Sequence, residues 1–108
     1  MFINLTTNKK ISKYYHIAGK FGLMFKKKIT KPYIFLFNHP QKQIWHMFFV
    51  KFPIDIIFLN EYGDIIESFE NLQPWNYYYP QLESNYVIEM PKGYIKRYKL
   101  NIGHRCLF

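Results

Sequence analysis

The sequence has a single cysteine, Cys106, so the chain cannot close a disulfide bond within itself. It also lacks an apolar run of the roughly 18 residues that a membrane-spanning helix needs. The longest candidate, residues 44–59, is interrupted by three polar side chains and by Pro53. The first ten residues contain no apolar core of the kind found in signal peptides. We therefore expect a soluble cytoplasmic protein that makes no use of a membrane.

Arginine and alanine are scarce, whereas Ile, Lys, Asn, Tyr and Phe together make up more than half of the 108 residues. All five can be encoded by codons that contain only A and T, so nucleotide composition explains much of this bias. The net charge of +8 would ordinarily indicate a nucleic-acid partner. Here the lysine excess is weak evidence for one. The basic stretches at residues 26–28 and 96–97 keep that alternative open without favouring it.

The length fits one domain, residues 1–108, with 49% hydrophobic residues and no linker or repeat. Short segments of alternating or continuous apolar residues, separated by Gly, Pro and Asn, predict β-strands. They lie at residues 2–6, 12–18, 33–37, 43–50, 54–59, 64–71, 85–90 and 104–108. Glycines around 19–25 favour a helical turn, and Pro91 begins a short helix that ends near residue 100. We expect a mainly β fold: a small antiparallel β-sandwich or barrel of seven to eight strands with two short helices.

Five motifs in order resemble domain-of-unknown-function family 192 (DUF192), in the form that archaeal members have. They are Gly22-Leu23-Met24-Phe25, residues 46–59 around Pro53-Ile54-Asp55, Asn71-Leu72-Gln73-Pro74-Trp75, residues 86–93 ending in Pro91-Lys92-Gly93, and Ile102-Gly103. The resemblance implies a small, mostly β sandwich and no established activity. The chain departs from the family at two places: Pro32-Tyr33-Ile34 replaces a Gly-Met motif, and His104 replaces an acidic residue.

Two carboxylates, Asp55 and Glu89, stand alone inside apolar strands. Burial raises the pKa of such a group, which lets it serve as a general acid or base near neutral pH. The alternative is structural: a buried carboxylate accepts hydrogen bonds that hold a strand or a loop in place. Whether the two carboxylates meet depends on strand pairing, which the sequence does not reveal.

Three further side chains are candidates for ligand contact. His46 offers an imidazole at the start of an expected strand, and Trp45 and Trp75 offer flat surfaces on which a sugar or a base stacks. Each of them also has a structural alternative in the core or in a loop. His104 and Cys106 lack the second ligand pair of a zinc site, and no phosphate-binding glycine loop is present. We therefore expect no metal and no cofactor.

Our leading hypothesis is a binding domain for a small polar or sugar-like ligand, in a cleft near Trp45, His46, Asp55, Trp75 and Glu89. An enzyme that uses Asp55 or Glu89 as general acid or base is the first alternative, and a basic nucleic-acid-binding module is the second. A pocket that holds both carboxylates would favour the first two functions. A continuous basic face without a pocket would favour the third.

If the lysine excess only reflects nucleotide composition, we expect the protein to bind DNA and RNA weakly and without sequence preference. The dissociation constants should then be roughly 10⁻⁴–10⁻⁶ M at physiological salt. Fluorescence anisotropy with single-stranded and duplex oligonucleotides of varied sequence measures this. Sub-micromolar binding that discriminates between sequences, and that is lost when Lys26, Lys27 and Lys28 become Gln, would contradict the expectation.

Overall fold

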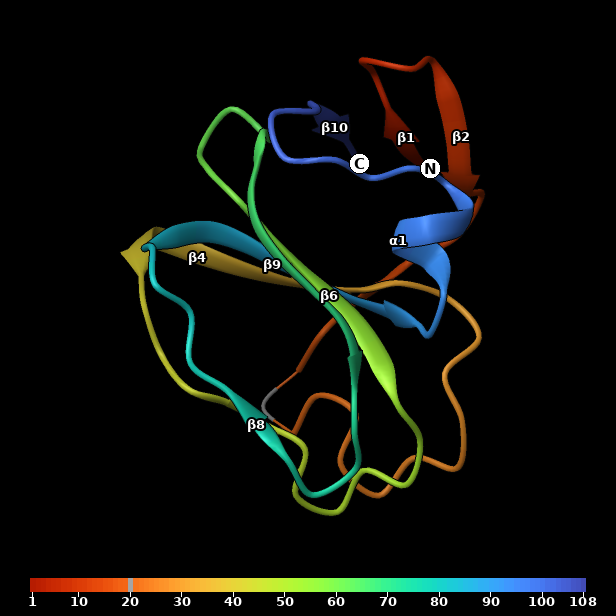
Figure 1. Ribbon diagram of the computed structural model, residues 1–108, viewed down its shortest axis with the longest axis vertical. Coiled ribbons are helices and arrows are strands. Elements are labelled where there is room, and N and C mark those ends of the chain that lie inside the picture. Colours follow the sequence, from red (N-terminus) through yellow and green to blue (C-terminus); the bar gives the residue numbers. More distant parts are fainter. Residues whose placement is uncertain (20) are drawn as a thin grey trace.

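A five-stranded sheet forms the centre of the computed structural model, which describes residues 1–19 and 21–108 (Figure 1). The strand order is β3 (His16–Ile17), β4 (Tyr33–Gln41), β9 (Ser84–Pro91), β6 (Ile54–Leu59) and β7 (Ile65–Leu72). β3 runs parallel to β4, and every other neighbouring pair is antiparallel. The sheet is open, and the structure is not a closed barrel.

Smaller elements cover both faces of this sheet. On one face lie the helix α1 (Tyr94–Arg97) and a three-stranded sheet of β10 (Cys106–Leu107), β1 (Phe2–Asn4) and β2 (Lys9–Ser12). The other face is covered by β5 (Trp45–His46), which pairs with β8 (Tyr77–Tyr78). Among the described residues, no helix is long and apolar enough to cross a membrane.

All six residues of β6 are buried, because the strand lies between β9 and β7 and is covered on both faces. Successive side chains of a strand point to opposite faces of the sheet. Ile57 and Leu59 pack with the three-stranded sheet, whereas Ile56 and Phe58 pack against Trp45. The continuous apolar sequence of residues 54–59 is thus what a strand covered on both sides requires.

Asp55 is the one charged residue in β6, and its carboxylate is satisfied entirely by backbone. The β6–β7 register shifts between Ile54 and Ile56, and Asn71 adopts a left-handed conformation with φ 57° opposite this shift. Oδ1 of Asp55 accepts the Asn71 N–H at 2.9 Å, and Oδ2 accepts the N–H groups of Gly93 at 3.1 Å and Ile95 at 2.9 Å. The carboxylate thereby joins the end of β7 to the start of α1.

The structure confirms the strand expected at residues 54–59, and those expected at 64–71 and 85–90 with bounds that differ by one residue at each end. Gly63 has φ 85° in the hairpin between β6 and β7, as its place in Asn60-Glu61-Tyr62-Gly63-Asp64 predicts. A Cβ there would approach the Cys106 carbonyl oxygen to 2.5 Å, so the hairpin also needs glycine for space. The short helix after Pro91 is confirmed, although it spans only Tyr94–Arg97.

The expectation of a strand over residues 43–50 is wrong except at β5. Directly after β5 the chain turns, and the Val50 N–H donates to the Met47 carbonyl. Met47 and Val50 point inward while Phe48 and Phe49 are exposed. An unbroken apolar sequence therefore does not show that every residue in it is buried.

The expected strand and helix counts also need correction. Residues 1–19 and 21–108 contain ten strands instead of the expected seven or eight. The expected strand at residues 12–18 divides between β2 and β3, and the aromatic loop at residues 73–80 contains β8. The helical turn expected over residues 19–25 includes Lys20, which lies outside the described residues. The described part of it, residues 21–25, forms hydrogen-bonded turns.

Asp55→Ala is expected to lower the free energy of unfolding by about 1–3 kcal/mol, because it leaves the buried Ile95 N–H and the partly buried N–H groups of Asn71 and Gly93 without acceptors. Glu70→Ala removes an exposed carboxylate from neighbouring β7 and is the matched control, with little expected effect. Urea denaturation followed by tryptophan fluorescence measures both variants. Equal stability of Asp55→Ala and the parent would contradict a structural role for Asp55.

Candidate functional site

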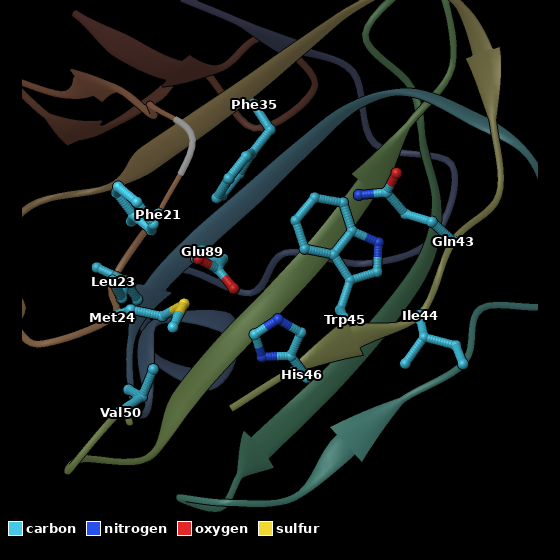
Figure 2. A pocket seen from close by; sticks show the side chains of 11 residues that line it. Phe21, Leu23, Met24, Phe35, Gln43, Ile44, Trp45, His46, Val50 and Glu89 are labelled. Carbon is cyan, nitrogen blue, oxygen red and sulfur yellow. The ribbon is translucent and has the colours of Figure 1, made fainter. Parts of the chain in front are cut away.

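A cavity of about 140 Å³ opens between the large sheet and the segments that cover it on the β5 side. Its lining comes from three parts of the chain: residues 21–24, residues 43–46 with Val50, and the pair Phe35 and Glu89 on neighbouring strands. Figure 2 shows the Glu89 carboxyl pointing into the space between Met24, Trp45 and His46. The sheet thus supplies the floor of the cavity, and two loops supply its walls.

Glu89 is only 5% exposed, because β9 lies between β4 and β6 in the middle of the sheet. Tyr33 and Ile56 are its neighbours across the two ladders. Burial raises the pKa of the Glu89 carboxyl to about 8, and no described residue donates a hydrogen bond that would stabilise the anion. At neutral pH the group is therefore mainly a neutral acid, able both to donate and to accept a hydrogen bond.

Gly22 brings the first loop close to the floor of the cavity. A Cβ at this position would lie 3.1 Å from the Phe35 ring and 3.9 Å from Oε1 of Glu89. Its φ of 53° is also a conformation that glycine adopts more readily than other residues. Glycine thus permits both the turn and the close approach to Phe35. Any larger residue would narrow the cavity beside the carboxyl.

Trp45 and His46 form the opposite wall. Trp45 is buried and packs edge-on against Phe35 with ring centroids 4.8 Å apart, which fixes the indole as part of the core. His46 is exposed at the rim, and its Nδ1 accepts the Phe48 N–H at 3.3 Å. The neutral imidazole then carries its proton on Nε2 and is able to donate from that atom. The cavity therefore combines an aromatic wall with three polar side chains, Glu89, His46 and Gln43.

Asp55 and Glu89 lie on opposite faces of the sheet. The β6–β9 register pairs Ile56 with Glu89 and Asp55 with Met90, so alternation directs the two carboxyl groups away from each other. Asp55 is accordingly not among the residues that line the cavity. The two carboxylates, both candidates from the sequence, thus occupy two different environments.

Trp75 is likewise outside the cavity lining and is 57% exposed at a loop tip, where its ring contacts Phe48 and Phe49.

The two residues considered as metal ligands both have structural surroundings. Nδ1 of His104 accepts a hydrogen bond from the buried Asn4 side chain at 2.9 Å, so His104 helps to hold the N-terminal strand β1 in place. Burial raises the pKa of the Cys106 thiol to about 12, which leaves it protonated and unreactive.

Several residues of the cavity were not singled out from the sequence. Phe35 and Gln43 belong to β4 and to the segment that follows it, and Met24 belongs to the Gly22–Phe25 motif. The Gly22–Phe25 motif could have indicated the cavity wall that residues 21–24 form. Nothing local in the sequence indicates that Phe35 and Glu89 lie on one face, because that depends on the β4–β9 register, which pairs Phe35 with Val87.

The chain matches the family DUF192, described as uncharacterized ACR, over residues 17–108. A UPF0127 protein of Pyrococcus furiosus is 30% identical over 112 residues, which cover 95% of this chain and 93% of that protein. A UPF0127 protein of Thermococcus sibiricus is also 30% identical, over 110 residues that cover 95% of this chain and 71% of the relative. These matches confirm the resemblance seen in the motifs.

Two crystal structures share the fold. A protein of unknown function from Novosphingobium aromaticivorans superposes with a TM-score of 0.75 at 24% identity, over 82% of this chain and 66% of that one. A candidate transcription regulator from Sinorhizobium meliloti has a TM-score of 0.76 at 24% identity, over 81% of this chain and 70% of its own. The chain thus spans about two thirds of each solved structure, and at this identity the likeness concerns the fold.

Glu89→Gln is expected to change how stability depends on pH. The folded protein keeps the Glu89 proton up to its pKa of about 8, whereas the unfolded chain loses it near the ordinary value of 4.5. Between these values the unfolded state binds fewer protons, so wild-type stability falls as pH rises, by up to about 1.4 kcal/mol per unit from this group.

The neutral amide in Glu89→Gln has no such dependence. The stability of the variant relative to wild type is therefore expected to increase from pH 5 to pH 8, as measured by urea denaturation at several pH values. A difference that stays constant over this range would show that Glu89 ionises normally in the folded protein.

Proposed function

The chain belongs to the DUF192 family, and we propose that it is a binding domain for a small, neutral, polar ligand that enters the cavity beside Glu89. One observation carries this proposal: Glu89 is only 5% exposed, yet its carboxyl opens into a cavity, where no described residue donates a hydrogen bond to it. The carboxyl is therefore accessible to a ligand inside the cavity. A hydrogen bond that a ligand makes to such a group contributes about 0.5–1.5 kcal/mol.

The polar groups at the cavity favour a hydroxyl, carbonyl or amide on the ligand. Protonated Glu89 donates one hydrogen bond and accepts another, and Nε2 of His46 donates a further one at the rim. Phe35 and Trp45 offer apolar surface beside these groups. Binding pockets for small molecules commonly combine aromatic walls with a few convergent polar groups in this way.

The size of the cavity limits what enters it. A cavity of about 150 Å³ accommodates a molecule of the size of benzene, and the present one is about 140 Å³. It therefore admits one small ring or one end of a longer molecule. A sugar-like ligand fits this description if a single hydroxyl-bearing edge reaches Glu89 and the remainder lies over His46 at the rim.

General acid catalysis is a second candidate function, favoured by the raised pKa of Glu89. A carboxyl with a pKa of about 8 holds a transferable proton at neutral pH. Asp55 is the weaker candidate for this role, because three backbone N–H groups already occupy its oxygens. Conversion of a ligand found by the experiment below, with loss of turnover in Glu89→Gln, would support an enzyme.

A fragment panel of small alcohols, amides, monosaccharides and primary amines, followed by NMR of the labelled protein, tests the binding function. We expect a neutral hydroxyl or amide compound to shift the backbone signals of Gly22, Phe35 and Glu89. Glu89→Leu keeps the approximate volume but removes the carboxyl, and should weaken that binding five- to tenfold, which corresponds to about 1–1.4 kcal/mol.

Glu83, which is exposed and directly precedes β9, provides the control. Glu83→Gln removes a charge outside the cavity and should leave the affinity for the fragment unchanged. The proposal is wrong if no fragment shifts these signals, or if Glu89→Leu binds as well as the parent. Binding restricted to amines, and tightening as pH rises above 8, would indicate a cationic ligand of ionised Glu89 instead.

A further inference from the structure

Four exposed aromatic side chains belong to loops at one end of the molecule. Figure 1 shows these loops at the end opposite the two chain termini. We call this surface the aromatic loop end. It consists of Phe25, Phe48, Phe49 and Trp75, which are 67%, 45%, 46% and 57% exposed. The four residues come from the loop after β3, the turns after β5 and the turn after β7. Large exposed apolar patches of this kind mark interaction surfaces in many proteins.

The backbone holds three of these residues in an unfavourable conformation. Phe25, Phe49 and Trp75 have φ values of 67°, 61° and 66° in the left-handed region, which bulky side chains rarely adopt. Backbone hydrogen bonds maintain the arrangement: the Phe25 N–H donates to the Phe49 carbonyl at 3.0 Å, and the Trp75 N–H donates to the Met47 carbonyl at 2.9 Å. Glycine or asparagine would fit these positions better, so the aromatic rings reduce local stability. Strain of this type is found at functional surfaces.

The rings of the aromatic loop end pack against one another. Phe25 and Phe49 are stacked with centroids 5.1 Å apart, and Phe49 meets Trp75 edge-on at 4.9 Å. Phe48 stacks on the His46 ring at 4.9 Å. Phe25, Phe48 and Phe49 therefore each have one ring face against another ring, and the four residues together form an apolar tip that stays partly exposed.

All formal charge in these loops is positive. Lys26, Lys27 and Lys28 follow Phe25 directly, and Lys51 follows the Phe48–Phe49 pair; all four lysines are exposed. No Asp or Glu occurs in residues 21–53 or 71–79. An apolar tip with exposed lysines in the same loops is complementary to a surface that has an apolar interior and negative charge at its boundary.

We propose that the aromatic loop end docks on the surface of an anionic lipid bilayer. Trp and Phe rings insert at the boundary between headgroups and acyl chains, and lysines near the surface each contribute about 1 kcal/mol through anionic headgroups. Single-stranded nucleic acid would need open ring faces for base stacking, which ring-to-ring packing restricts here. A second copy of the chain is a poor partner for this surface, because it would bring two sets of positively charged lysines together and they would repel each other. The sequence alone did not suggest a membrane, since surface docking needs no long apolar segment.

Flotation of the full-length protein with vesicles of phosphatidylcholine, with and without phosphatidylserine, tests the proposal at physiological ionic strength. We expect binding to the anionic vesicles and little to the neutral ones. Trp75→Asn and Phe25→Asn should each reduce binding at least fivefold. Because asparagine tolerates the left-handed conformation, neither substitution should lower the melting temperature.

Lys26→Gln combined with Lys27→Gln tests the charge without touching the packing, and should weaken binding about fivefold for each lysine. Two controls lie at the other end of the fold: Lys9→Gln with Lys10→Gln on β2, and Tyr62→Asn in the β6–β7 hairpin, where Tyr62 is 65% exposed. These variants should bind vesicles as the parent does.

Three outcomes would overturn the proposal. The first is absence of vesicle binding, or equal binding to neutral vesicles. The second is tighter binding to a single-stranded oligonucleotide that the same loop variants abolish. The third is a concentration-dependent dimer in analytical ultracentrifugation that Trp75→Asn disrupts. None of the four aromatic residues lines the cavity beside Glu89, although the same loops supply its walls.

Discussion

The pairing of β9 with β4 on one side and β6 on the other is the constraint on which the site depends. A strand with neighbours on both sides has no freedom to move its backbone, and its register determines the face to which each side chain points. Glu89 is therefore directed into the cavity by hydrogen bonds that run between strands far apart in the sequence. The loops around residues 22 and 46 then complete the walls.

The two buried acids show how one fold treats the same functional group in two ways. Asp55 lies where the β6–β7 ladder shifts, and its carboxylate accepts the Asn71 N–H at this shift and the N–H groups of Gly93 and Ile95 at the start of α1. Glu89 lies where the ladders on both sides are regular, so no spare N–H is available to it. Its burial raises the pKa to about 8 and favours the neutral form. One carboxyl is bonded to the backbone at the end of the sheet, and the other opens into a cavity.

The two ends of the sheet also differ in their chemistry. Near the termini, Arg105 pairs with Asp64 at 2.7 Å, and Gly63 closes the hairpin against Cys106. At the opposite end, the loops carry exposed aromatic residues, three of them with left-handed backbone, together with exposed lysines and no acidic residue. The ion-paired hairpin and the exposed aromatic loops thus lie at opposite ends of the sheet (Figure 1).

The sequence by itself determined the local features: the apolar segments that become β6 and β9, the hairpin around Gly63, the burial of Asp55 and the family of the chain. These features follow from side-chain alternation, turn chemistry and ordered motifs, all of which act over a few residues. Only the tertiary structure decided that Asp55 and Glu89 lie on opposite faces, that Trp45 and His46 join Glu89 while Trp75 does not, and that the chain turns after β5. The physical reason is that register and packing are set by contacts between distant strands, and a shift of one residue would have reversed every face.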